Sequence, residues 1–140
     1  MEGLENAILL CQAEIDAHGP TAETCFRMGA LLARADRFSE AFAALEQAIQ
    51  IDPTHARACK ELARLSLAAN EMRAFANWCH EALRLDPGDP EPHLMMAEVL
   101  AERRRWEEAR DELRLALSLR PLPEDHRARA ASLLTSLEKK

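Results

Sequence analysis

The sequence predicts an all-α protein made of repeated helix pairs, and three observations support this prediction. Proline recurs every 34 residues, at Pro53, Pro87 and Pro121, each time after a short apolar phrase: AIQIDP, ALRLDP and ALSLRP. Apolar residues recur three to four positions apart, which is the period of a helix, with no two-residue alternation typical of strands. Ala, Leu, Glu and Arg dominate the composition, whereas Tyr is absent and only 4 glycines are present.

The proline period divides the chain into three units, at residues 22–55, 56–89 and 90–123. Before them, residues 1–21 are expected to hold a helix over 4–15 and a linker. After them, residues 124–140 are expected to form a C-terminal capping helix with a polar outer face. A fixed period of this length indicates a stacked repeat array, so we expect about seven to eight helices.

Each unit is predicted to contain two helices, A and then B. Small residues at the eighth and twenty-seventh positions of every unit let two helices approach closely. These residues are Gly29, Ala63 and Ala97, followed by Ala48, Ala82 and Ala116. The twentieth position is also small in two units, at Ala41 and Ala109, but the middle unit places Phe75 there. The middle unit is therefore expected to pack less regularly than the other two.

The turn between helices A and B is predicted at Asp36, Asn70 and Arg104. Asp and Asn tolerate the left-handed backbone conformation better than other residues that carry a side chain, but Arg does not. We therefore expect the third turn to be built differently from the first two. Helix B should end at the proline, because proline disfavours helical geometry in the residue before it. Those preceding residues are Asp52, Asp86 and Arg120.

The three units resemble the tetratricopeptide repeat, a 34-residue helix pair with the pattern W-x2-L-G-x2-Y, then A-x3-F, then P. The first unit supplies Cys25, Met28, Gly29, Leu32, Ala41, Leu45 and Pro53. The second supplies Cys59, Leu62, Ala63, Ser66, Phe75, Cys79 and Pro87, and the third His93, Met96, Ala97, Leu100, Ala109, Leu113 and Pro121. The resemblance covers residues 22–123 and implies a right-handed superhelical α-solenoid of antiparallel helix pairs. It also implies a non-catalytic scaffold, an adaptor or chaperone-like protein, that binds a peptide segment in its concave groove.

In this family the groove is lined by recurring positions on the A helices. Carried onto this sequence, the resemblance assigns to the groove Glu23, Phe26, Ala30, Arg34, Arg57, Lys60, Arg64, Leu67, Glu91, Leu94, Glu98 and Glu102. The middle A helix then carries a basic stripe and the next A helix an acidic one. One interpretation is a groove that holds a carboxylate or phosphate of a peptide. The other is that the two stripes neutralise each other, since a surface ion pair is worth only about 0–1 kcal/mol.

Members of this family that bind chaperone tails hold the terminal carboxylate with Lys, Asn and Arg side chains. The matching residues here are Phe26, Ala30, Glu61, Glu91 and Met95. None of them is of the required type, so the sequence argues against the tail-binding function.

Two features outside the groove are further candidates for contacts. Leu4 and Ile8 belong to the helix over 4–15, which has the pattern of a B helix without its own A helix. This helix could cap the stack, mediate self-association as a homo-oligomer, or continue an array in a longer multidomain protein or enzyme. Trp78 stands where the other units have Ala44 and Glu112. It is either repacked locally beside Phe75, the interpretation we prefer, or an aromatic anchor for a partner.

The remaining composition narrows the function. A formal net charge of −6 argues against general nucleic-acid binding, and neither a membrane span nor a basic secretion signal is recognisable. We therefore expect a cytoplasmic protein with a protein or peptide partner, whose four cysteines act as small buried hydrophobes. The Cys79-His80 neighbours point about 100° apart on a helix, so we predict no catalysis from them. The 5 histidines show no H-x3-H spacing, and we predict no metal and no cofactor.

Overall fold

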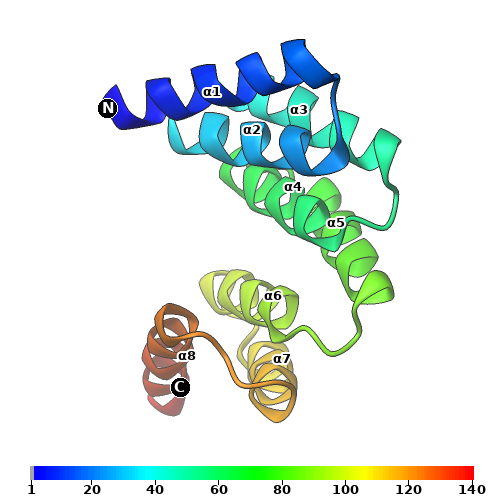
Figure 1. Cartoon of the computed structure of the whole chain (residues 1–140). Coiled ribbons are helices and arrows are strands. Elements are labelled where there is room, and N and C mark those ends of the chain that lie inside the picture. Colours follow the sequence, from blue (N-terminus) through cyan, green and yellow to red (C-terminus); the bar gives the residue numbers. More distant parts are fainter. Residues whose placement is uncertain (1) are drawn as a thin grey trace. The chain divides into compact units, whose positions relative to one another are not determined.

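The computed structural model describes residues 2–140, and this part of the chain is all-α (Figure 1). Its helices are α1 (Glu2–His18), α2 (Ala22–Arg34), α3 (Phe38–Ile51), α4 (Ala56–Ala68), α5 (Met72–Leu85), α6 (Pro90–Glu102), α7 (Trp106–Ser118) and α8 (Glu124–Glu138). No strand occurs between residues 2 and 140. The predicted fold class and the predicted number of helices are therefore confirmed.

The helices form two compact units, Met1–Leu85 with α1 to α5 and Asp86–Lys140 with α6 to α8. In the first unit α2 packs on α3 and α4 on α5, while α1 lies against α2. In the second unit α6 packs on α7, and α8 contacts both. The largest fully buried side chains are Leu45 and Leu62 in the first unit, and Leu94, Leu113 and Leu137 in the second. Each unit thus has its own apolar core.

Close approach of two helices explains the small residue at Gly29. A Cβ atom added there would lie 2.5 Å from Cγ of Leu45 and 3.3 Å from the carbonyl oxygen of Ala41. Leu45 and Ala41 both belong to α3 and are fully buried. The eighth position is therefore small because the backbone of α2 lies directly against α3.

Side-chain caps begin the three A helices. Thr21 and Thr24 form a reciprocal capping box at α2, with N–H to hydroxyl distances of 3.1 and 2.9 Å. At α4 the Nδ1 atom of His55 accepts a hydrogen bond from the backbone N–H of Ala58 at 3.1 Å. At α6 the Asp89 carboxylate accepts from the N–H of Glu91 at 3.0 Å. Each cap satisfies backbone donors that the first helical turn leaves without partners.

The third A–B turn contradicts the sequence prediction. Arg104 has a φ of 62°, almost the same as Asp36 at 60° and Asn70 at 59°. The N–H of Arg104 donates to the carbonyl of Ala101 at 3.0 Å, and the next N–H, of Arg105, donates to Leu100 at 2.9 Å. The other two turns contain the same pair of bonds, which is the Schellman motif. These two backbone hydrogen bonds hold Arg104 in a conformation that its side chain disfavours.

Each B helix ends two or three residues before its proline. Asp52 and Asp86 lie just beyond α3 and α5, as predicted. The Asp52 carboxylate accepts hydrogen bonds from the N–H and hydroxyl of Thr54, at 3.0 and 2.6 Å, and these bonds lower its pKa. Arg120 also lies outside its helix, as predicted, because α7 ends at Ser118. The Arg120 guanidinium donates to the Asp86 carboxylate at 2.5 Å.

The cysteines are buried thiols, as the sequence predicts. Burial raises the pKa of Cys59 to about 11, so this thiol stays protonated at neutral pH. Cys79 is fully buried whereas His80 is exposed, so the two side chains do not share an accessible site.

Candidate functional site

In the first unit, α2 and the start of α4 bring four side chains together: Glu23, Phe26, His55 and Arg57. The Cζ atom of Arg57 lies 4.5 Å from the centroid of the Phe26 ring, a cation–π geometry. The Glu23 carboxylate lies 3.7 Å from the Arg57 guanidinium and 3.2 Å from Nε2 of His55. The rings of Phe26 and His55 are 5.0 Å apart. Three of these four residues are among those predicted to line the groove.

His55 is the member of this cluster that sequence reasoning missed. Its Nδ1 atom accepts the capping hydrogen bond of α4, so in the neutral ring Nε2 carries the hydrogen and donates to Glu23. His55 lies immediately before α4, but His is not among the residue types preferred at a helix N-cap, so the sequence carried no strong signal for this role. Phe26 is buried, since Arg57 and His55 lie against its ring.

The other predicted groove residues of the first unit have different surroundings. Arg64 pairs with Glu61 on the same helix, and Lys60 and Leu67 are half-buried. Ala30 lies on α2 beside an apolar depression next to α1, and Arg34 is exposed at the end of α2. Arg57, with 63% of its side chain exposed, is the most accessible of the basic stripe.

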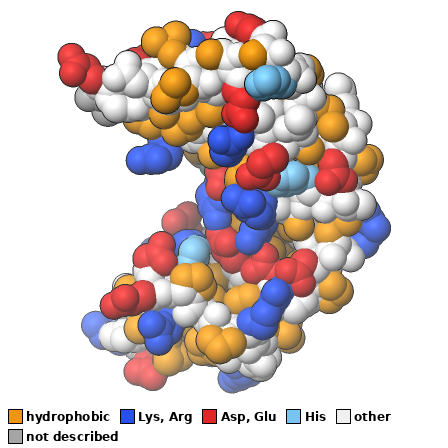
Figure 2. All heavy atoms as spheres, viewed as in Figure 1, with side chains coloured by type: hydrophobic (Ala, Val, Ile, Leu, Met, Phe, Trp, Pro, Cys, Tyr) orange, Lys and Arg blue, Asp and Glu red, His pale blue; other side chains and the backbone are white. Residues whose placement is uncertain are grey.

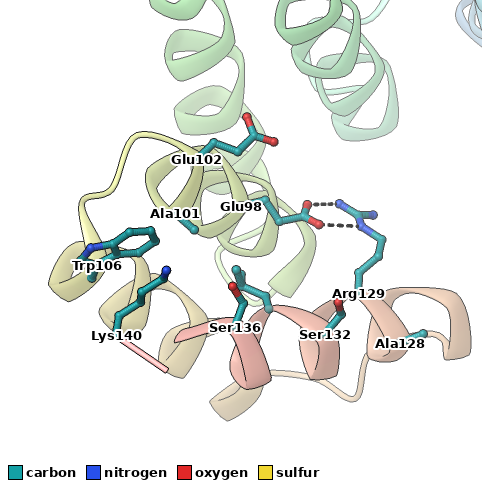
Figure 3. Close-up of a pocket in the computed structure, with 10 residues that line it drawn as sticks. Glu98, Ala101, Glu102, Trp106, Ala128, Arg129, Ser132, Ser136 and Lys140 are labelled. Carbon is teal, nitrogen blue, oxygen red and sulfur yellow. Dashed lines mark hydrogen bonds and ion pairs between the residues drawn. The ribbon is translucent and has the colours of Figure 1, made fainter. Parts of the chain in front are cut away.

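In the second unit the predicted acidic stripe is engaged by α8. Arg129 contacts the Glu98 carboxylate with two nitrogens (Figure 3). His126 lies 3.4 Å from the carboxylate of Glu91. Glu102 is exposed, while Leu94 is fully buried in the core of this unit. The sequence pattern did not reveal these partners on α8, because a 34-residue period does not specify which charges meet.

The same helices line an open pocket of about 650 Å³. Glu98, Ala101 and Glu102 of α6 form one side, and Ser132 and Ser136 of α8 form the other (Figure 3). Nζ of Lys140 lies 5.0 Å from the centroid of the Trp106 ring. Ser132 and Ser136 occupy the ninth and thirteenth positions if the repeat numbering is continued past residue 123. Extending the groove positions onto residues 124–140 would therefore have found them.

The candidates outside the groove lie mostly against the core of the first unit. Trp78 is half-buried and packs against that core. Ile8 is buried and Leu4 half-buried, so these two residues hold α1 in place. The exposed large apolar residues of α1 are instead Leu9 and Leu10. Figure 2 shows hydrophobic side chains, in orange, on the surface over α1.

Neither a membrane-spanning helix nor a cluster of potential metal ligands occurs in residues 2–140. None of the helices there is long and apolar enough to cross a membrane. Within the same range, no three His, Cys, Asp or Glu side chains are grouped so that they could hold a metal ion.

The helix pairs, the Schellman turns and the A-helix surface define a helical repeat protein. The chain belongs to the tetratricopeptide repeat family, whose model matches residues 32–80 and 74–137. The fold of this family is a protein–protein interaction module that is in general non-catalytic, and it implies protein partners. The chain matches no curated protein sequence.

Solved structures of other tetratricopeptide proteins share the fold. MamA has a TM-score of 0.74 and 18% identity, over 82% of this chain and 67% of MamA. The P58(IPK) TPR domain has a TM-score of 0.74 and 21% identity, over 84% of this chain and 33% of that structure. PilF from Pseudomonas aeruginosa has a TM-score of 0.70 and 22% identity, over 92% of this chain and 65% of PilF. These similarities support an all-α solenoid of helix pairs.

Proposed function

We propose that the protein is a non-catalytic adaptor that binds a peptide segment on its A helices, with Arg57 as the contact for a carboxylate or phosphate. One observation carries the proposal. The Arg57 guanidinium is stacked over Phe26 at 4.5 Å while most of its side chain remains exposed. The ring restricts the rotamers of Arg57, so less conformational entropy is lost when an anion binds.

The existing partner of Arg57 does not prevent this role. Glu23 lies 3.7 Å away, and half of its side chain is exposed. An exposed pair of this kind contributes about 0–1 kcal/mol, whereas a guanidinium can bind a carboxylate or phosphate with two parallel hydrogen bonds. His55 offers Glu23 a second partner at 3.2 Å, so Glu23 keeps a hydrogen bond when Arg57 turns to a ligand.

The proposal also covers the organisation of the chain and its compartment. We assign the interaction surface to repeats 22–55, 56–89 and 90–123. The four buried thiols support a reducing compartment such as the cytoplasm, where they are not oxidised to disulfides. The acidic charge of the chain supports a protein partner rather than a nucleic acid.

An array of short acidic peptides, each present with and without phosphoserine, tests the proposal. We expect a subset to bind the wild-type protein and to bind Arg57→Glu at least about tenfold more weakly, because the main anion contact becomes a repulsive carboxylate. Arg73→Glu is the matched control, since Arg73 is exposed on α5 and has the same charge change. Equal binding by wild type and Arg57→Glu, or equal losses in both variants, contradicts the proposal.

A further inference from the structure

Helix α1 has the sequence pattern of a B helix, but the side that a B helix turns toward its A helix is open. Leu10 occupies the position that Glu112 holds in α7, where Glu112 contacts His93 of the A helix α6 at 2.7 Å. Leu10 is 72% exposed. Beside it, an apolar groove of about 370 Å³ runs along α1 and α2, lined by Ala7, Leu10, Cys11, Phe26, Ala30 and Leu31 together with Arg27.

Helix α8 has the sequence pattern of an A helix, but the side that an A helix turns toward its B helix is exposed. Its eighth and eleventh positions are Ala131 and Leu134. In α2 the same positions are Gly29 and Leu32, which are buried against the B helix α3. In α8 both are exposed, Leu134 to 43%. The outer face of α8 is therefore not the wholly polar one predicted for a capping helix.

A second apolar groove lies beside this face. It has a volume of about 170 Å³ and is formed by α7 and α8, with Leu113, Leu117, Leu134 and Leu137 in its lining. Leu117 is itself exposed. The chain thus presents an unpaired B-type helix at one end and an unpaired A-type helix, with its adjoining groove, at the other.

We propose that two copies of this chain associate head to tail, with α8 of one copy packing antiparallel on α1 of the next. The contact reproduces between two molecules the A–B pair that each molecule forms within itself at α2 and α3. Leu10 of one copy would cover the Ala131 and Leu134 face of the other. The groove beside Leu10 shares Phe26 and Ala30 with the predicted peptide groove. The proposed contact itself is made by Leu10, Ala131 and Leu134, none of which contacts Arg57, so the proposal does not depend on peptide binding.

The charges at the helix ends agree with the antiparallel direction. The first turn of α1 carries Glu2 and Glu5, and an A helix that pairs antiparallel with it ends beside that turn. Helix α8 is followed there by Lys139 and Lys140. At the opposite end the first turn of α8 carries Glu124 and Asp125, while the last turn of α1 carries His18. Opposite charges would therefore meet where α1 begins and α8 ends, and at the other end the His18 ring would face the two carboxylates of α8.

The contact joins two different surfaces, so a dimer still has one free α1 surface and one free α8 surface. Such a heterologous contact produces rings or open chains rather than only dimers. We therefore expect the average mass of the wild-type protein in solution to rise with concentration. Added salt should lower the mass, because it screens the charged ends.

Two variants and their mixture test this geometry by sedimentation velocity. Leu10→Glu blocks only the α1 end, and Leu134→Glu blocks only the α8 end; each variant alone should stay monomeric. Mixed in equal amounts, they should form a one-to-one dimer, because each variant keeps the end that the other lacks. Leu115→Glu is the matched control, since Leu115 is 46% exposed on α7 at a position that holds Gln47 and Glu81 in the other repeats. It should associate like wild type.

Three outcomes overturn the proposal: a wild-type protein that stays monomeric at every concentration, a mixture that does not dimerise, or a loss of association in Leu10→Glu while Leu134→Glu still associates like wild type. The last result would indicate a symmetric contact between two copies of α1. If either leucine variant loses helical circular dichroism, Glu2→Lys with Glu5→Lys replaces Leu10→Glu, and Lys139→Glu with Lys140→Glu replaces Leu134→Glu. Each charge variant should then weaken association alone, and mixing the two should restore it.

Discussion

The pairs α2/α3 and α4/α5 have the same architecture but fill the space between their helices differently. In α2/α3, Gly29 brings the backbone of α2 against Leu45, and Ala41 lies beside the contact. The same three positions of α4/α5 hold Ala63, Cys79 and Phe75, which are also buried. On the A helix Ala63 is larger than Gly29, and on the B helix Cys79 is smaller than Leu45. Phe75 takes the place of Ala41. The comparison shows that the repeat period determines where helices touch, while facing residues share the available volume between them.

The largest difference in stability between the two pairs is expected when the buried side chain of the B helix, Leu45 or Cys79, is truncated to Ala. Leu45→Ala removes a fully buried side chain and should lower the free energy of unfolding by about 2–5 kcal/mol. Cys79→Ala removes a single sulfur atom from the corresponding position and should cost only about 1 kcal/mol. Urea denaturation followed by far-ultraviolet circular dichroism measures both. Equal losses would mean that the two positions are packed alike, against the comparison drawn above.

A smaller effect is expected from filling the close contact in α2/α3. Gly29→Ala places a methyl group 2.5 Å from Cγ of Leu45. The crowding should destabilise the protein by about 1–3 kcal/mol, even though Ala is the better helix former.

The matched test of this explanation is a double-mutant cycle. In a Leu45→Cys background the first pair acquires the Ala and Cys combination of the second, so Gly29→Ala should cost less there than in wild type. Gly3→Ala is a control within a helix, because apart from its chain neighbours and the nearby backbone of α1 no described atom lies within 4 Å of the added Cβ. Strict additivity of Gly29→Ala and Leu45→Cys would show that the two positions do not share volume.

The smallest effect concerns the turns rather than the pairs. Arg104→Gly should stabilise the second unit by about 0.5–1 kcal/mol, because glycine adopts a positive φ without the steric cost of a side chain. The same change at Asn70 should have little effect, since Asn already tolerates this conformation. Thermal unfolding of both variants checks the prediction. A gain at Asn70 equal to that at Arg104 would show that side-chain identity does not strain the third turn.

The repeat positions alone brought together three residues of the candidate site, whose role in binding stays a prediction. The assigned positions place Glu23, Phe26 and Arg57 in the groove, and these three side chains meet in the structure. The same reasoning also assigned Leu94 to the groove, although its side chain is fully buried in the core of the second unit. Position within a repeat indicates a face of the helix, but it does not tell whether a neighbouring helix covers that face.

The sequence by itself determined the all-α fold, the A–B turns and most of the helix ends, because these depend on interactions within a few residues along the chain. The caps at Thr21 and Asp89 and the prolines that follow Asp52 and Asp86 act locally. Only the tertiary structure decided that Arg129 engages Glu98, that Arg57 covers Phe26, and that Leu10 and Leu134 remain exposed. Those outcomes depend on distances between helices, and a periodic pattern specifies the face of a helix without specifying what lies opposite it. The third turn is also decided locally, since two backbone hydrogen bonds between residues 100 and 105 outweigh the conformational preference of Arg104.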